Sequence, residues 1–274
     1  MRKWIFIALV CVGALPANAQ IAWPEGKSAA IVLSYDDGLQ SQLDIAIPQL
    51  DHARFKATFF LDGDVTAAEK LRWHKVQQSG HELGNHSYFH PCPRALLPDR
   101  PKYETESYDV SRMLGEITAM NDVLESIDGA KSRTYSVPCS QMLVGGTDYT
   151  GALRVSGLVK YARTGGDAFR SVVTDPKALD RFQVPSWGPV DHPDGPHLVA
   201  YVMRVQEAHG LGVLQFHGVG GDYLEVSERA HLELIQVRPE RLHEVGRVAG
   251  APREQEDDRL VSEPPRGKGE RGGR

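Results

Sequence analysis

Three small groups of acidic and imidazole side chains have types and spacings that suit chemistry at a metal ion. Asp36 and Asp37 are adjacent, His86 and His90 are four residues apart, and His217 stands between a phenylalanine and a glycine. Two histidines four apart on a helical turn face the same side and can bind one metal ion. With one carboxylate they leave coordination positions open for water, which is typical of catalytic rather than structural metal sites.

Each group alone also has an ordinary explanation. An Asp-Asp-Gly tripeptide is more typical of a simple acidic turn, and a single histidine is more often structural than catalytic. Adjacent carboxylates, however, are costly unless a cation or hydrogen bonds offset their repulsion. All three groups directly follow short apolar segments, and ligand sites in parallel β-α folds gather at the carboxyl ends of strands. These positions favour one shared site.

The elements that would position these groups alternate along the chain. Seven short, apolar, β-prone segments are expected to be strands, and four segments between them have helical periodicity. This alternation predicts an α/β fold of parallel β-α units in a single domain, either an open sheet or a barrel. The expected strands are Ala30–Tyr35, Ala57–Leu61, Glu82–Asn85, Thr134–Val137, Val159–Ala162, Phe182–Pro185 and Gly212–Phe216, and the expected helices are Leu43–Ala53, Thr66–Ser79, Ser107–Ile127 and His197–His209.

The two ends of the chain differ from this pattern. Residues 1–19 combine a basic start, a short apolar run and Ala17-Asn18-Ala19, which predicts a signal peptide cleaved after Ala19. The run is too short to span a bilayer. We therefore expect a secreted or periplasmic protein without membrane contact after cleavage. Residues 236–274 contain no aromatic residue and no isoleucine, so we expect a disordered or foreign tail after a catalytic domain at 20–235.

Charge and cysteine content narrow the partners. The formal net charge is −5 and no dense basic stripe is present, which argues against nucleic acid as a partner. We expect a monomer that acts on a small or polymeric substrate. After signal cleavage two cysteines remain, Cys92 and Cys139. Export permits a disulfide between them, but spacing alone does not set their separation, so a bridge and two free thiols both remain open.

The order of the motifs adds a family resemblance. Asp-Asp-Gly, then the histidine pair, then a turn at Pro138 and then strand-His-Gly resembles the polysaccharide deacetylases of the NodB-homology type, carbohydrate esterase family four, over about residues 29–234. The resemblance implies a distorted (β/α)7-type barrel that hydrolyses acetyl groups on a carbohydrate. It also implies one divalent metal ion, most commonly zinc, bound by Asp37, His86 and His90.

The same resemblance implies the remaining roles. Asp36 would be the general base that takes a proton from the attacking water, and His217 the general acid that protonates the leaving group. The backbone N–H of Cys139 would stabilise the oxyanion. The substrate pocket, including the wall around the acetyl methyl group, would be lined by Trp187, Leu214 and Tyr135.

Two positions depart from the family pattern. The family has an arginine two residues before Pro138, where it orients the base, and this chain has Ser136. Arg133 would point the opposite way along a strand, so another group is expected to orient the base, with Ser136 itself a candidate. The family's aspartate before the tryptophan is also absent, which leaves Asp180 and Asp191 as the nearest candidate partners of His217.

Several functions remain compatible with these residues. Hydrolysis of N-acetyl groups on aminosugar polymers or oligomers, of the chitin or peptidoglycan type, is the leading interpretation. Hydrolysis of O-acetyl esters on xylan would use the same side chains. A carbohydrate-binding protein without catalysis would have no need of a base and an acid, and a hydrolase of non-sugar amides would have little reason to be exported.

Overall fold

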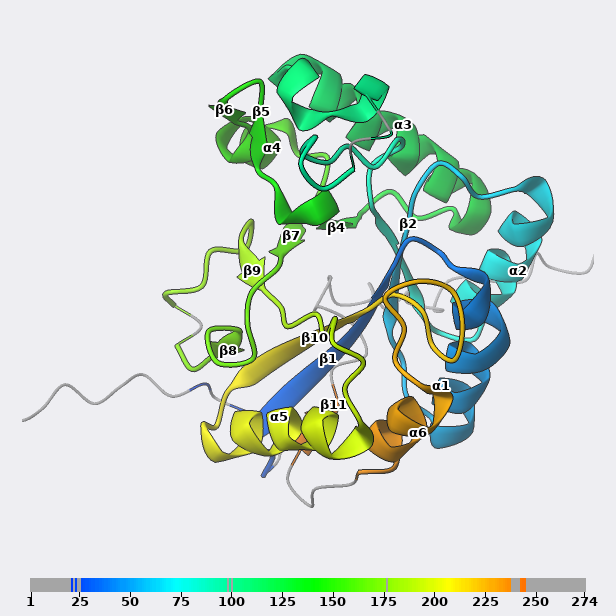
Figure 1. Cartoon of the computed structure of the whole chain (residues 1–274), viewed down its shortest axis with the longest axis vertical. Coiled ribbons are helices and arrows are strands. Elements are labelled where there is room, and N and C mark those ends of the chain that lie inside the picture. Colours follow the sequence, from blue (N-terminus) through cyan, green and yellow to red (C-terminus); the bar gives the residue numbers. More distant parts are fainter. Residues whose placement is uncertain are drawn as a thin grey trace, which may run out of the picture.

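Seven parallel strands form the framework of the molecule (Figure 1). The computed structural model describes residues 21, 23, 26–97, 99, 101–175, 177–237 and 242–244. The strands are β1 (Ala29–Asp36), β2 (Thr58–Leu61), β3 (Glu82–Asn85), β4 (Thr134–Ser136), β7 (Tyr161–Thr164), β9 (Val184–Pro185) and β10 (Leu211–Phe216). They lie side by side in the order β10-β1-β2-β3-β4-β7-β9, and every neighbouring pair is parallel. Each strand overlaps or directly adjoins one of the seven expected segments.

The sheet curls until its two ends nearly meet. Trp187, just after β9, donates its backbone N–H to the carbonyl of Val213 on β10 (2.9 Å). Its own carbonyl accepts the N–H of Gln215 (2.9 Å). This contact gives a nearly closed barrel, so the predicted distorted barrel is confirmed. Because the seven strands are parallel, all their carboxyl ends lie at one end of the barrel.

Two further strands extend the sheet. β8 (Val172–Val173) pairs antiparallel with β10. β11 (Leu242–Glu244) pairs parallel with residues 29–31 of β1, whose later residues pair with β2. β11 lies within residues 236–274, which were expected to be a disordered or foreign tail, and its backbone groups pair with a stretch of β1 that β2 leaves open. Residues 1–19 and 245–274 lie outside the described residues.

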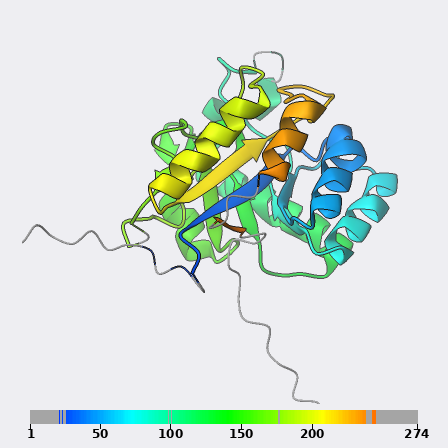
Figure 2. The same cartoon turned by 90° about the horizontal axis from the view of Figure 1, so that it is seen from below.

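Helices cover the outside of the barrel. In Figure 2, α5 (Gly195–Glu207) and α6 (Glu228–Gln236) lie side by side across β10 and β1. The four expected helices are present, whereas α6 and the short helix α4 (Thr150–Ser156) were not expected. Among the described residues no helix has the length and apolar character needed to cross a membrane. The other helices are α1 (Ile47–Ala53), α2 (Ala67–Gln78) and α3 (Val110–Asp128).

Short turns complete the architecture. A π-helical turn at Gln42–Ala46 runs directly into α1, and 3₁₀ turns lie at Pro101–Tyr103, Thr105–Ser107 and Pro138–Ser140. A small hairpin joins β5 (Leu143–Val144) and β6 (Thr147–Asp148). Asp109 caps the start of α3, and its side chain accepts the Arg112 N–H (2.7 Å). Gly129 follows the last residue of the helix in the left-handed conformation that a helix C-terminus favours.

The alternation of side chains along β1 separates the core from the barrel interior. Leu33 and Tyr35 point outward into the large apolar core beneath the helices. Val32 points inward, where it meets Val184 and Val213. Successive strand residues face opposite sides, so Asp36 at the end of β1 also belongs to the interior. The strand thus delivers one carboxylate to the carboxyl end of the barrel.

A buried histidine links three elements of the outer core. His231 of α6 lies between Tyr35 of β1, whose hydroxyl is 2.6 Å from Nε2, and Gln49 of α1, whose Oε1 is 2.6 Å from Nδ1. Because Oε1 can only accept, Nδ1 carries the proton and Nε2 accepts the tyrosine hydroxyl. Burial lowers the pKa of His231 to about 3, so the ring is neutral in the folded protein.

The depressed pKa of His231 predicts acid sensitivity of the fold. His231 takes up a proton near pH 6.5 in the unfolded chain and only near pH 3 in the folded protein. The free energy of unfolding should therefore keep its full value above pH 6.5 and fall below it by on the order of 1 kcal/mol per pH unit. Urea unfolding between pH 4 and 8 should show this slope, and His231→Gln should reduce it below pH 6.5. Identical slopes in the two proteins would contradict the assignment.

Candidate active site

The chain turns sharply where β1 ends. Asp37 (φ 74°) and Gly38 (φ 63°) both have left-handed backbone conformations, which is uncommon for a residue with a side chain. The fully buried Gln42 donates its amide group to the carbonyl of Asp36 (2.6 Å) and to that of His217 (3.1 Å). This side chain therefore ties the ends of β1 and β10 together beneath the site.

The structure brings Asp37, His86 and His90 together. The Nε2 atoms of His86 and His90 lie 3.2 Å and 3.5 Å from Oδ1 of Asp37, and the three candidate ligand atoms all lie within 4.8 Å of one another. Oδ1 is buried and has no hydrogen-bond partner among the described groups. A carboxylate oxygen without a partner and two converging imidazole nitrogens fit a divalent cation such as zinc.

The two histidines converge by a different route from the one expected. The segment after β3 is an irregular loop rather than a helical turn, and Ser87 (φ 61°) and His90 (φ 50°) are left-handed. Nδ1 of His86 donates to the carbonyl of Ser136 (2.7 Å), which directs Nε2 towards Asp37. The argument from helical spacing is therefore wrong, although the side chains do meet.

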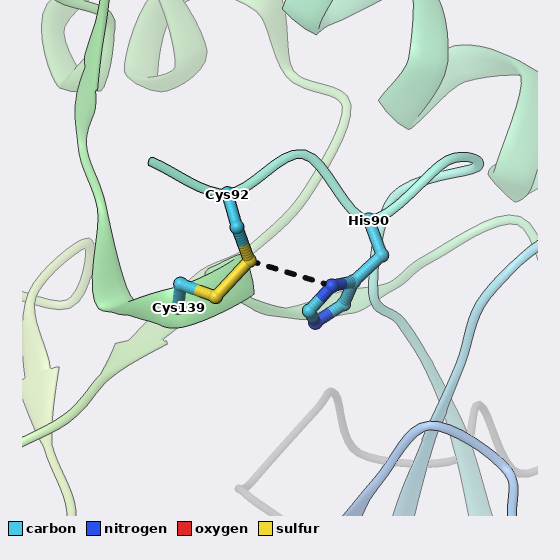
Figure 3. A group of neighbouring side chains, drawn as sticks. All are labelled: His90, Cys92 and Cys139. Carbon is cyan, nitrogen blue, oxygen red and sulfur yellow. Dashed lines mark hydrogen bonds between the residues drawn. A yellow bond between two sulfur atoms is a disulfide. The ribbon is translucent and has the colours of Figure 1, made fainter. Parts of the chain in front are cut away.

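A disulfide lies beside His90. Cys92 and Cys139 are bonded, with their Cα atoms 5.6 Å apart, and Sγ of Cys92 is 3.6 Å from Nδ1 of His90 (Figure 3). Since each sulfur is bonded to the other, neither is a thiolate that could bind a metal ion. The bridge joins the histidine loop to the turn after β4, whose Cys139 N–H is predicted to face the oxyanion.

Asp36 lies in a network of buried hydrogen bonds. A guanidinium nitrogen of Arg163 contacts both carboxylate oxygens, at 2.6 Å from Oδ1. Ser136 Oγ (3.2 Å) and Gln215 Nε2 (3.0 Å) also donate to Oδ2. Burial alone would raise the pKa of Asp36, but the charge of Arg163, with help from His86, outweighs it and lowers the pKa. Asp36 is therefore held ionised.

The guanidinium reaches Asp36 from a neighbouring strand. In the register of β4 and β7, Ser136 lies directly opposite Arg163, and the serine is small enough to let the arginine in. Arg163 also donates to Gln215 (2.6 Å) and Ser186 (3.0 Å). Arg133 instead forms an ion pair with Asp128 (2.7 Å), as expected for a side chain pointing away from the site. The only sequence signal for Arg163 was a charge at the carboxyl end of an expected strand.

His217 lies on the other side of Asp37. Its Nε2 is 3.7 Å from Oδ2 of Asp37, and the side chain is 15% exposed. In the described part of the chain the two aspartates suggested as partners of His217 have other surroundings. Asp180 pairs with Arg154 (2.7 Å), and Asp191 lines a separate cavity against α5. The two candidates were chosen for their closeness in sequence to Trp187, whereas the carboxylate that faces His217 is that of Asp37, directly after β1.

Two of the three residues expected to line the substrate pocket have no exposed surface. Leu214 and Tyr135 are fully buried on the outward sides of β10 and β4, so neither side chain can touch a substrate. Trp187 packs against Tyr201 of α5, with ring centroids 4.9 Å apart. His217 follows Phe216, so the inward neighbour on β10 is Gln215 rather than Leu214. Trp187, which is half-buried, stays a predicted lining residue of the pocket.

Two further groups near the site had no sequence signal. Tyr223 donates its hydroxyl to Oδ2 of Asp37 (2.8 Å) from the loop after β10. Asp62 follows β2, and burial, together with the negative charge of Asp37, raises its pKa to about 6. Both lie at the carboxyl end of the barrel. The rule that sites gather at strand ends predicts a site there, but it does not say which residues of the loops take part.

Comparisons with known proteins agree with this geometry. The family model described as polysaccharide deacetylase matches residues 24–149, which include Asp36, Asp37, His86 and His90. Over these residues the chain is similar to the polysaccharide deacetylase family. A Bacillus subtilis relative, the uncharacterized protein YlxY, is 31% identical over 96 residues, which are 35% of this chain and only 26% of that protein.

Solved structures share the fold. The Bc1960 peptidoglycan N-acetylglucosamine deacetylase is 19% identical, with a TM-score of 0.54 over 81% of this chain and 88% of that one. The Xyl-CE4 domain of a multidomain xylanase from the hindgut metagenome of Trinervitermes trinervoides is 16% identical, with a TM-score of 0.51 over 79% of this chain and 86% of that one. At these identities the likeness establishes the barrel alone.

The ion pair of Asp36 and Arg163 predicts a strong dependence between the two residues. Arg163→Met should destabilise the protein by about 3–5 kcal/mol, because it leaves a buried carboxylate without its counter-charge. Asp36→Asn combined with Arg163→Met should recover most of that loss. Urea unfolding of the two variants measures both effects. Additive losses in the double variant would show that the two residues are not coupled.

The metal set predicts the behaviour of His86. His86→Ala should weaken zinc binding by more than the roughly 10- to 100-fold typical of losing an outer-shell partner, measured by competition with a chelator. Burial favours the neutral ring, but the carboxylates of Asp36 and Asp37 outweigh it and raise the pKa of His86 to about 9. Zinc affinity should therefore increase with pH up to about 9. His52→Ala, an exposed position on α1, serves as the control.

Proposed function

We propose that the protein is an exported, metal-dependent deacetylase that hydrolyses N-acetyl groups on aminosugars in a chitin- or peptidoglycan-type polymer or oligomer. The observation that carries the proposal is the pairing of two carboxylates with different surroundings. The carboxylate of Asp36 is paired with the guanidinium of Arg163. The adjacent Asp37 faces two imidazoles with its Oδ1 atom, which has no hydrogen-bond partner among the described groups. A base beside a cation site is what hydrolysis by an activated water requires.

The residues divide the chemistry between them. A divalent cation bound by Asp37, His86 and His90 would polarise the acetyl carbonyl and make a water molecule more acidic. Asp36 accepts the proton of the attacking water, and its contacts with Arg163 and Gln215 keep the carboxylate deprotonated and fixed in orientation. Proton transfer by a positioned group of this kind contributes about a hundred- to ten-thousand-fold.

The departing amine needs a proton from the opposite side. His217 is partly exposed and lies against the other oxygen of Asp37, so it can reach a substrate that also reaches the cation. The turn at Cys139 would provide a backbone N–H to the oxyanion. The disulfide between Cys92 and Cys139 keeps this turn beside His90, and it supports export to an oxidising compartment.

The substrate class rests on the family and on named neighbours. The Bc1960 protein is named for the N-acetylglucosamine of peptidoglycan, and the Xyl-CE4 domain belongs to a xylanase. Metal-assisted attack by water suits an amide and an ester equally. We place aminosugar N-acetyl groups first and propose acetylated xylan as the second substrate to test.

The test is acetate release by the mature protein. With zinc, acetylated chitooligosaccharides should release acetate, and a chelator should abolish the release. Asp36→Asn together with Arg163→Met should keep zinc and the fold but lose at least about a hundredfold in kcat. Asp44→Asn, an exposed change on the turn before α1, is the matched control. If only acetylated xylan released acetate, the substrate class would be O-acetyl esters on xylan rather than N-acetyl groups on aminosugars. If neither substrate released acetate, the proposed function would be refuted.

A further inference from the structure

We propose that Tyr223 is a positioning residue for the candidate metal ligand Asp37. Its hydroxyl would hold one carboxylate oxygen so that the other stays directed at the cation. This inference rests on the metal site of the proposed function, but not on the identity of the acetylated substrate. It assigns a role to a loop that neither the sequence motifs nor the barrel itself explains.

The two oxygens of Asp37 have different surroundings. Oδ2 accepts the hydroxyl of Tyr223 at 2.8 Å. Oδ1 lies 3.2 Å from Nε2 of His86 and 3.5 Å from Nε2 of His90, and no other described group donates a hydrogen bond to it. A carboxylate held at one oxygen cannot rotate freely, so the lone pairs of the other keep a fixed direction. Hydrogen bonds to the outer oxygen of a ligand are a general means of tuning metal affinity.

The loop that carries Tyr223 is firmly attached beside the site. Gly218 donates its N–H to the carbonyl of Tyr223 (3.1 Å), and Val226 donates to the carbonyl of Gly218 (3.0 Å). The side chain of Asp222 accepts the N–H of Ser41 (2.8 Å), at the start of the π-helical turn. These bonds fix both ends of a short excursion from β10 and anchor it to the segment that follows Asp37.

The backbone on both sides of Tyr223 is in an unfavourable conformation. Asp222 (φ 63°) and Leu224 (φ 47°) are left-handed, which is rare for a branched apolar residue such as leucine. Such conformations persist only where surrounding structure imposes them, and they gather at functional sites. Tyr223 as a whole residue is 53% exposed, so burial of the ring does not explain the strained backbone. The conformation brings the hydroxyl within hydrogen-bond distance of Asp37.

Loss of the hydroxyl would release Asp37 towards a competing partner. Nε2 of His217 is 3.7 Å from Oδ2, close enough for the carboxylate to rotate and pair with it. That rotation would turn Oδ1 away from His86 and His90. The hydrogen bond from Tyr223 therefore keeps Asp37 from pairing with His217. It would keep Asp37 directed at the cation and leave His217 free to act as the acid.

The test is zinc affinity of the full mature chain, measured by competition with a chelator at one pH. Tyr223→Phe removes only the hydroxyl, and its dissociation constant for zinc should rise by about 10- to 100-fold. Asp222→Ala loosens the anchor of the loop and should weaken zinc binding in the same direction, but less. Tyr161→Phe, the same change at the start of β7, should leave zinc affinity unchanged.

Each result decides the assignment. Wild-type affinity in Tyr223→Phe overturns it, and equal weakening in Tyr161→Phe overturns it as well. Weakening in Asp222→Ala without weakening in Tyr223→Phe would show that the loop matters and the hydroxyl does not. If the wild-type chain itself binds no zinc, both the metal site and the role of Tyr223 fail. If zinc binds and Tyr223→Phe weakens it while no acetate is released, the role of Tyr223 stands and the proposed substrate fails.

Discussion

Two carboxylates leave the same strand end at consecutive positions, and the site is organised around keeping both of them charged. Asp36 is neutralised within the protein by the guanidinium of Arg163, in a buried ion pair that needs no ligand. Asp37 is left with two imidazoles and one oxygen without a partner, an arrangement that a cation would complete. The difference between the two environments turns a repulsive pair into a base and a ligand. Removing either counter-charge would leave a buried carboxylate uncompensated, which would destabilise the folded protein.

The barrel determines which side chains can join this site. Parallel strands bring all their carboxyl ends to one end, and alternation assigns every second residue to the interior. Asp36, Ser136 and Gln215 share the interior for this reason, whereas Leu214 and Tyr135 belong to the outer core. The interior below the site is polar around Arg163 and apolar around Val32. The polar network thus ends where the small apolar cluster begins.

Much of this was predictable from the sequence, because strand ends and short motifs are local features. The seven strands were predicted from apolar segments, and the two histidines from their position after a strand, whereas the choice of Asp37 as the third ligand came from the family resemblance. Arg163 could not be found this way, since its role depends on the register between β4 and β7. Tyr223 depends on the path of an irregular loop, and no periodicity encodes such a path. Leu214 and Tyr135 were expected at the pocket from the family pattern, whereas the alternation of side chains along β10 and β4 places both in the outer core.

The disulfide at the carboxyl end of the barrel makes the stability of the protein depend on the redox state of its surroundings. Cys92 and Cys139 are 47 residues apart in sequence, and a crosslink over that distance removes about 4 kcal/mol of chain entropy from the unfolded state in the simplest account. The strands beneath are joined by main-chain hydrogen bonds that no reductant touches. In a reducing medium the loop that carries His90 would lose its covalent link to the turn after β4, and the unfolded state would regain this entropy, so reduction would favour unfolding.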